Sequence, residues 1–101
     1  MISAEIFRDK SGIVGFTVKN HGKSHVCAAV SMLVINTVNS IETFTDDKFT
    51  CDYNEEGGYL AFTLNQTASV GTAILLNAMV LGLTSTREQH PKQISIQEIR
   101  T

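Results

Sequence analysis

The spacing of apolar residues changes repeatedly along this sequence, and each change predicts a switch between strand and helix. Up to residue 18, apolar residues tend to fall at every second position, as on one face of a strand. From His25 to about Phe44 they fall three or four positions apart, as on one face of a helix. The residues of this helical face are Val26, Val30, Leu33, Val34, Val38 and Ile41. Strands and helices must therefore share one core.

Two pairs of alternating segments predict two antiparallel hairpins. The segments are residues 2–8 and 13–18 in the first pair, and residues 49–53 and 59–64 in the second. Between them lie Asp9-Lys-Ser-Gly12 and Asn54-Glu-Glu-Gly-Gly58, both rich in residues that favour turns. After Pro91, the spacing of Ile94 and Ile96 predicts a last strand.

The second helical segment runs from Thr67 to about Thr84, with Thr67 or Ser69 near its start. It is apolar nearly all round, whereas a surface helix usually keeps one polar face. In a chain of 101 residues, a sheet can cover one side of such a helix and leaves another side bare. We therefore expect a second subunit to cover that side, which makes the protein a homodimer.

The predicted order of elements is ββαββαβ. Both helices can bury their apolar residues against one face of a sheet built from the hairpins. The predicted fold is therefore a two-layer α+β fold, with a mainly antiparallel sheet and two helices packed on one face. A chain of 101 residues fits a single domain over residues 1–101.

The composition excludes several classes of function. The formal net charge is −2 and the basic residues are scattered, so no face is expected to bind nucleic acid. Glu5 and Arg8 interrupt the N-terminal segment where a signal peptide needs apolar residues. The longest apolar stretch, Ala73 to Leu83, is shorter than the ~20 residues of a membrane span. We expect a cytoplasmic protein that does not enter a membrane, with both cysteines as free thiols.

Cys27 is the strongest candidate for a chemical role. If Ser24 caps the first helix, Cys27 is its third residue and lies near unpaired backbone N–H groups. These groups and the helix dipole favour a thiolate, which is the nucleophile of cysteine hydrolases. A small buried cysteine packed at a helix start is the alternative interpretation, and these residues alone leave both open.

Two histidines lie close enough in sequence to serve as a general base for Cys27. His25 is two positions from Cys27, and residues two apart on a helix point in different directions. His21 follows a strand, and Gly22 gives its loop the freedom to fold back toward the helix. His21 is therefore the better candidate, and His25 is expected to face solvent.

Other site chemistries are less well supported. A metal site could combine His21, His25 and Cys27 with Cys51 or His90, but the paired cysteines of structural zinc sites are missing. We therefore expect no metal and no cofactor. A serine hydrolase lacks a serine in a nucleophile elbow. In the alternating pattern Cys51 shares one face of the strand with Phe49 and Tyr53, which indicates a buried structural thiol.

The segment Val26-Cys-Ala-Ala-Val-Ser31 opens a helix after a strand and a loop that contains glycine and histidine. In this it resembles the bacterial ribosomal-processing cysteine protease family called Prp. The resemblance extends to the length, the two hairpins, the two helices, the turn at residues 54–58 and the final strand. The Cys-Ala-Ala-Val-Ser motif is its specific part.

The resemblance implies a homodimeric cysteine endopeptidase, which removes a short N-terminal extension from a large-subunit ribosomal protein. It implies Cys27 as the nucleophile and His21 as the base, with Ser31 and Gly22 in supporting positions. The expected partner is therefore a peptide segment of a ribosomal protein. Family members usually have Gly-His-Ala at the histidine and a longer loop before the cysteine. The alternative is accordingly a weakly active or non-catalytic homodimeric module of the same fold that binds a peptide or the ribosome.

Overall fold

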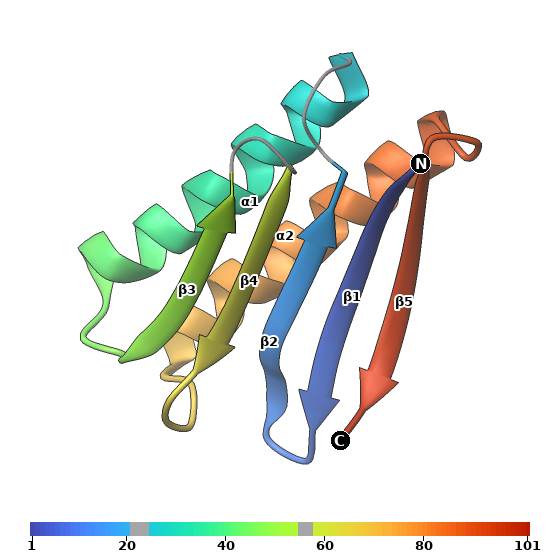
Figure 1. Ribbon diagram of the computed structural model, residues 1–101. Helices are drawn as coiled ribbons and strands as arrows, with labels where there is room; N and C mark the ends of the chain where they lie inside the picture. Colours follow the sequence, from blue (N-terminus) through green and yellow to red (C-terminus); the bar gives the residue numbers. More distant parts are fainter. Residues whose placement is uncertain (21–24, 55–57) are drawn as a thin grey trace.

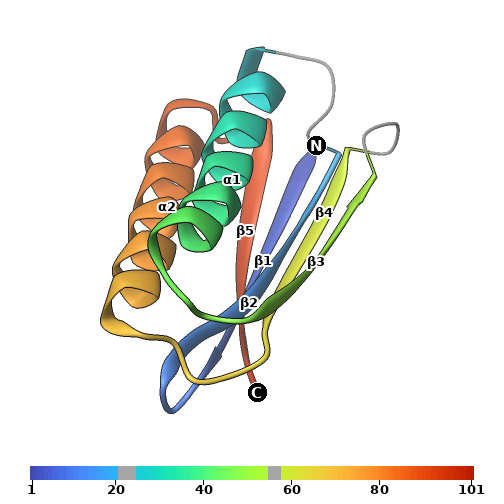
Figure 2. The same cartoon turned by 90° about the vertical axis from the view of Figure 1, so that its left-hand side faces the viewer.

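The computed structural model describes residues 1–20, 25–54 and 58–101 and contains one sheet with two helices on one of its faces (Figures 1 and 2). The elements in chain order are β1 (Ile2–Asp9), β2 (Gly12–Lys19), α1 (His25–Phe44), β3 (Phe49–Asn54), β4 (Tyr59–Leu64), α2 (Val70–Gln89) and β5 (Ile94–Arg100). The predicted order ββαββαβ and the two-layer α+β fold are confirmed.

The sheet has five strands in the order β3-β4-β2-β1-β5. Both predicted hairpins form, and β2 also pairs antiparallel with β4. β5 pairs parallel with β1, from Ile2 opposite Ile94 to Arg8 opposite Arg100. The sheet is therefore mainly antiparallel, as predicted, and its two edges are β3 and β5.

The core lies between the sheet and the helices. On β1 the residues Ile2, Ala4 and Ile6 are buried against the helices, while the residues between them are partly exposed on the other face. Phe16 and Phe62 stack in the centre with ring centroids 5.2 Å apart, and Phe49 lies 5.0 Å from Phe62. Each fully buried large apolar side chain contributes about 1.5–3 kcal/mol. Core packing therefore holds both helices on the sheet.

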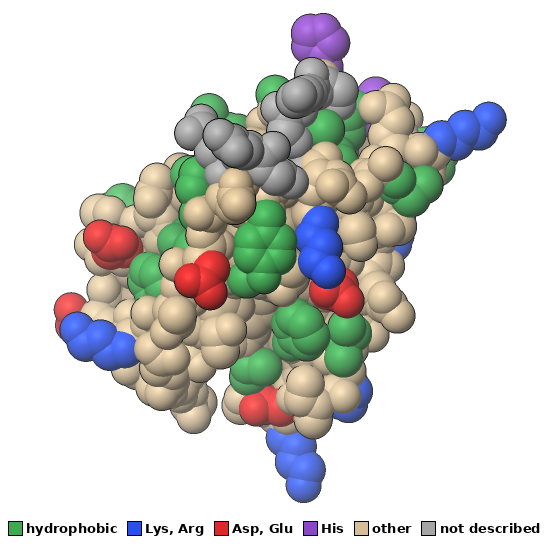
Figure 3. All heavy atoms as spheres, viewed as in Figure 1, with side chains coloured by type: hydrophobic (Ala, Val, Ile, Leu, Met, Phe, Trp, Pro, Cys, Tyr) green, Lys and Arg blue, Asp and Glu red, His purple; other side chains and the backbone are tan. Residues whose placement is uncertain are grey.

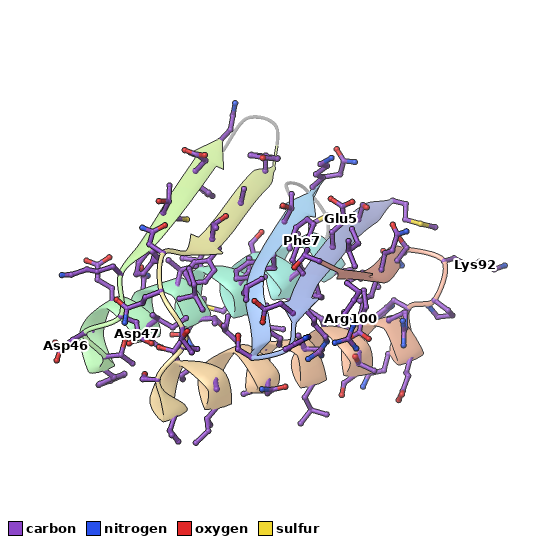
Figure 4. All side chains as sticks on the ribbon, turned by 90° about the horizontal axis from the view of Figure 1, so that it is seen from below. Glu5, Phe7, Asp46, Asp47, Lys92 and Arg100 are labelled. Atoms are coloured by element: carbon purple, nitrogen blue, oxygen red, sulfur yellow. The ribbon has the colours of Figure 1, made fainter. Side chains whose placement is uncertain are left out.

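The opposite face of the sheet is not covered by either helix (Figure 2). Figure 3 views this face and shows hydrophobic side chains at its centre with charged side chains around them. Glu5 and Phe7 project from it, as Figure 4 shows.

The second helix begins later and ends later than predicted. Ser69 is the N-cap, because its hydroxyl accepts a hydrogen bond from the Thr72 backbone N–H. The helix continues to Gln89, where the His90 backbone N–H bonds to the Thr86 carbonyl. Its last five residues, 85–89, are polar, so the apolar pattern could not reveal them.

Both helices are 20 residues long, and their mean hydropathy of 1.3 for α1 and 1.2 for α2 would satisfy a composition test for a membrane span. Core helices pass the same test. In this structure the apolar face of α1 packs on the sheet, and the buried residues of α2, Thr72, Leu76, Met79 and Leu83, face the same core. The predicted absence of membrane insertion stays a prediction.

Hydrogen bonds of Asp47 link the segment after α1 to the start of α2. One oxygen of its carboxylate accepts the Ser69 backbone N–H at 2.8 Å, and the other lies 3.4 Å from the Gln66 amide nitrogen. A side-chain hydrogen bond with Thr72, followed by the bond from Ser69, holds the pKa of Asp47 below its ordinary value of 3.8. The ionised carboxylate therefore stabilises the folded state more than the protonated form does.

Replacing Asp47 is expected to lower stability in a pH-dependent way. Because the folded-state pKa is depressed, the carboxylate stabilises the fold above pH 3.8 and loses this effect as the pH falls through the folded-state pKa. Asp47→Asn should lower the Tm at neutral pH, and the difference from wild type should shrink in acid. Thermal unfolding at several pH values measures this, with Asp46→Asn at the exposed neighbouring residue as the control. Equal losses for both variants, or a loss that is independent of pH, would contradict the role of Asp47.

Candidate active site

A small cleft lies beside the N-terminal end of α1. This end of the helix lies near the upper end of the sheet in Figure 1. Its volume is about 180 Å³. It is lined by Met1, Ile2, Asn20, Cys27, Lys92 and Gln93. These residues come from the start of the chain and of β1, the position after β2, the first turn of α1 and the turn before β5. Residues that are far apart in the sequence thus surround the thiol predicted to be the chemical centre.

Cys27 is held in this cleft by the packing of α1. The helix begins at His25, so Cys27 is its third residue, as predicted. Val26 is buried in the core, and Cys27 is half-buried, packing against the core while it lines the cleft. At this position the sulfur lies in the first turn, where backbone N–H groups lack helical partners. The thiol is therefore both anchored and accessible.

Asn20 closes one side of the cleft with an unusual backbone conformation. Its φ is 65°, in the left-handed region that asparagine tolerates better than most residues. In this conformation its carbonyl oxygen accepts a hydrogen bond from Cys27 Sγ at 3.4 Å. Its side-chain amide lies 3.4 Å from the Met1 carbonyl oxygen, which links β2 to the start of β1. A thiol donates such a bond only while it is protonated, so this contact is one that the neutral thiol makes and a thiolate does not.

The other predicted site residues have different outcomes. His21 and Gly22, with the predicted cap Ser24, lie outside the described residues. His25 is exposed on α1 and is not among the residues lining the cleft, in agreement with the expectation that it faces solvent. Ser31 is half-buried, one helical turn after Cys27. Their catalytic and supporting roles stay predictions.

Several lining residues were not recognised from the sequence. Lys92 and Gln93 reach the cleft because β5 pairs with β1, and the Ile2 backbone N–H bonds to the Gln93 carbonyl at 2.9 Å. The Lys92 side chain points away from the body of the molecule, as Figure 4 shows. No local motif marks these residues, since a parallel pairing between the two ends of a chain has no sequence signature.

Cys51 lies on another side of α1, in a pocket lined by Ile35, Val38, Asn39, Cys51, Tyr53 and Leu60. Cys51 shares the helix-facing side of β3 with Phe49, as predicted, but it is half-buried rather than enclosed. Burial raises the pKa of the Cys51 thiol above its ordinary value, and the neighbouring Asp52 carboxylate adds to the rise. Cys51 is therefore poorly suited to act as a nucleophile at neutral pH. Within the described ranges, no group of three or more His, Cys, Asp or Glu side chains is placed to hold a metal ion.

Comparison with known proteins places this fold and cleft in a family. The family model described as cysteine protease Prp matches residues 1–95. The chain belongs to the Prp family of cysteine proteases. No curated protein matches the sequence.

Three solved structures share the fold over almost the whole chain. The ribosomal processing protease Prp from S. aureus in complex with a substrate peptide is 21% identical, with a TM-score of 0.90, and the match covers 98% of this chain and 100% of that chain. The same protease with a covalently linked product peptide is 22% identical, with a TM-score of 0.91 and the same coverage. The protein SMU.848 from Streptococcus mutans is 28% identical, with a TM-score of 0.91, and the match covers 100% of this chain and 96% of that chain.

The contact between Asn20 and Cys27 predicts how a substitution changes thiol reactivity. A β-branched residue strongly disfavours a positive φ, so Asn20→Val should move the carbonyl away from the sulfur. A hydrogen bond contributes about 0.5–1.5 kcal/mol, and a weak S–H donor belongs at the lower end, so alkylation of Cys27 by iodoacetamide should become roughly two- to fourfold faster. The rate is measured by peptide mapping, which separates Cys27 from Cys51.

Asn20→Gly is the matched control, because glycine adopts the left-handed conformation freely and keeps the carbonyl in place. It should alkylate at close to the wild-type rate. Equal rates for Asn20→Val and wild type would show that the contact does not control the thiol.

Proposed function

We propose that this protein is a cysteine endopeptidase that removes a short N-terminal extension from a large-subunit ribosomal protein. The observation that carries the proposal is the accessible Cys27 in the first turn of α1, in a chain that belongs to a cysteine protease family. The S. aureus relative is described as a ribosomal processing protease in complex with a substrate peptide. The same reaction by this chain is the simplest account of its fold and its thiol.

In the proposed mechanism His21 accepts the proton of the Cys27 thiol, and the thiolate attacks the carbonyl carbon of the scissile peptide bond. Backbone N–H groups of the first turn of α1 stabilise the negative oxygen that develops. The imidazolium of His21 then protonates the leaving amine, which departs and leaves a thioester on Cys27. A water molecule, deprotonated by His21, hydrolyses the thioester and regenerates the thiolate.

The Asn20 carbonyl opposes the first step of this mechanism. Its hydrogen bond with Cys27 Sγ ends when the proton moves to His21, and a carbonyl oxygen 3.4 Å from a thiolate is repelled by it. Activation therefore requires the carbonyl and the sulfur to separate when the peptide binds. Gly22 would supply the backbone freedom for this movement, and Ser31 would support the thiol from the next helical turn.

The proposed enzyme is a homodimer whose subunits meet through α2. α2 exposes Val70, Ile74 and Leu81, which are 78%, 63% and 69% exposed, on the side away from its buried residues. This surface fits a homodimer contact, which sedimentation of wild type against a Leu81→Asp variant would test. We further propose that the enzyme works in the cytoplasm, uses no cofactor, and requires neither nucleic acid nor a membrane.

A second function is favoured by the same contact at Asn20. A thiol held by a carbonyl acceptor, together with the short segment between His21 and Cys27, fits a weakly active or non-catalytic homodimeric module that binds a peptide or the ribosome. Such a module would keep the fold and the cleft without cutting its ligand. Cleavage of the precursor separates the two functions.

Wild-type protein incubated with the ribosomal precursor from the same organism should shorten it at one bond, as measured by intact mass. Cys27→Ala should abolish the cleavage, since it removes the proposed nucleophile, whereas Cys51→Ala should retain it. His21→Ala should reduce it by roughly 100-fold or more, the usual contribution of a general base. An intact precursor with wild-type protein, or equal trimming by Cys27→Ala, would contradict the proposed activity.

A further inference from the structure

β3 lies at one edge of the sheet. Among the described strands it pairs with β4 alone. In an antiparallel pair, the backbone N–H and C=O groups of alternate residues point away from the partner strand. An edge strand therefore offers a row of donors and acceptors to another extended chain. The ligand that suits such an edge is an extended peptide, because its backbone carries donors and acceptors at the same spacing.

The β3 edge has little of the protection that edge strands usually carry. Its six residues pair with β4 at consecutive positions, without a bulge or a proline, and Asp52 is its one charged residue. The other edge, β5, carries Glu98 and Arg100, and Glu98 forms an ion pair of 2.9 Å with Arg8 on β1. Charges of this kind discourage strand addition. β3 is therefore the edge that is open to an added strand.

A pocket of about 350 Å³ opens beside this edge, between α1 and β3. Its walls are Ile35, Val38 and Asn39 from α1, Cys51 and Tyr53 from β3, and Leu60 from β4. Cys51 and Tyr53 are two positions apart, so both side chains leave β3 on the side that faces α1. The side chains of a strand added to β3 would alternate in the same way, and one of them would enter the pocket. The volume lies at the lower end of the ~300–1,000 Å³ of ligand sites, which suits one bulky apolar side chain.

We propose that the β3 edge and this pocket dock an extended segment of the peptide substrate. The main chain of the segment pairs with β3, and one bulky apolar side chain fills the pocket. This inference rests on the proposed peptidase function and names a recognition site for it. Ile35 lies eight residues after Cys27 on the same helix, a rise of ~12 Å, which about four extended residues span. Because the pocket also lies on another side of α1 from the cleft, the recognised side chain lies at least about four residues from the bond that is cut.

A second copy of the chain fits this site less well than an independent peptide. If two β3 strands paired with each other, Cys51 and Tyr53 of each copy would still line the pocket of their own copy. The same helix-facing side chains would then have to line one pocket and fill the other. The exposed apolar residues of α2 also give a second copy a separate surface to cover.

Cys51 reports directly on occupation of the site. The chain has two cysteines, so Cys27→Ser leaves Cys51 as its one thiol and also prevents cleavage. The probe is a synthetic peptide that spans the N-terminal extension and the cleavage site of the ribosomal precursor. At saturating peptide, alkylation of Cys51 by N-ethylmaleimide should slow by at least about fivefold, because mass action keeps the site occupied. If Cys51 is alkylated at the same rate when the peptide is bound, the docking site is wrong. It is also wrong if, without peptide, Cys51 becomes protected as the protein concentration rises, because a second copy then covers the site.

A kinetic measurement tests the site in the cleaving enzyme. Cys51→Phe fills the pocket and should raise KM for the precursor about tenfold, the loss expected when a buried apolar side chain is excluded, while kcat stays near wild type. The control is Thr63→Phe, which introduces the same side chain on the uncovered face of β4 and should change neither KM nor kcat. Cleavage with an unchanged KM in Cys51→Phe would overturn the docking site and leave the peptidase function intact. If the peptide protects Cys51 but wild-type protein does not cleave the precursor, the docking site is supported and the peptidase function is wrong.

Discussion

The packing of α1 on the sheet determines where both thiols of this protein lie. Val26, Val30 and Val34 are buried along one face of the helix, which fixes its rotation about its axis. With that rotation fixed, Cys27 in the first turn must point into the cleft above β1 and β2. Further along, the flank of the helix forms the wall of the pocket that holds Cys51. A helix that rotated or slid on the sheet would lose both arrangements together.

The two thiols differ because their surroundings differ. Cys27 lies at a helix start beside backbone N–H groups, with the Asn20 carbonyl as its acceptor. Cys51 lies between a helix and an edge strand, where burial and Asp52 both oppose ionisation. In the proposed mechanism the Asn20 carbonyl must leave Cys27, whereas the surroundings of Cys51 suit a side chain that packs. The proposed division of labour, chemistry at Cys27 and recognition beside Cys51, follows from this contrast.

Much of the fold could be predicted from the sequence, because local patterns encode it. The predicted bounds of β4 and the predicted start of α1 are confirmed, and Cys27 is the third residue of α1 as predicted. The end of α2 was missed, since residues 85–89 are polar and carry no apolar period. Lys92 and Gln93 were missed for another reason: they reach the cleft through the parallel pairing of β5 with β1, which depends on the whole sheet. The left-handed conformation of Asn20, which brings its carbonyl to Cys27 Sγ, was also missed.

Trapping Cys27 with a substrate mimic tests most directly whether it is the nucleophile of a peptidase. A peptide with the sequence before the cleavage site of the precursor, ending in a chloromethyl ketone, places an alkylating carbon where the scissile bond lies. We expect one adduct per chain, mapped to Cys27 by mass spectrometry and prevented by an excess of uncleaved peptide. No adduct, or an adduct mapped mainly to Cys51, would contradict it.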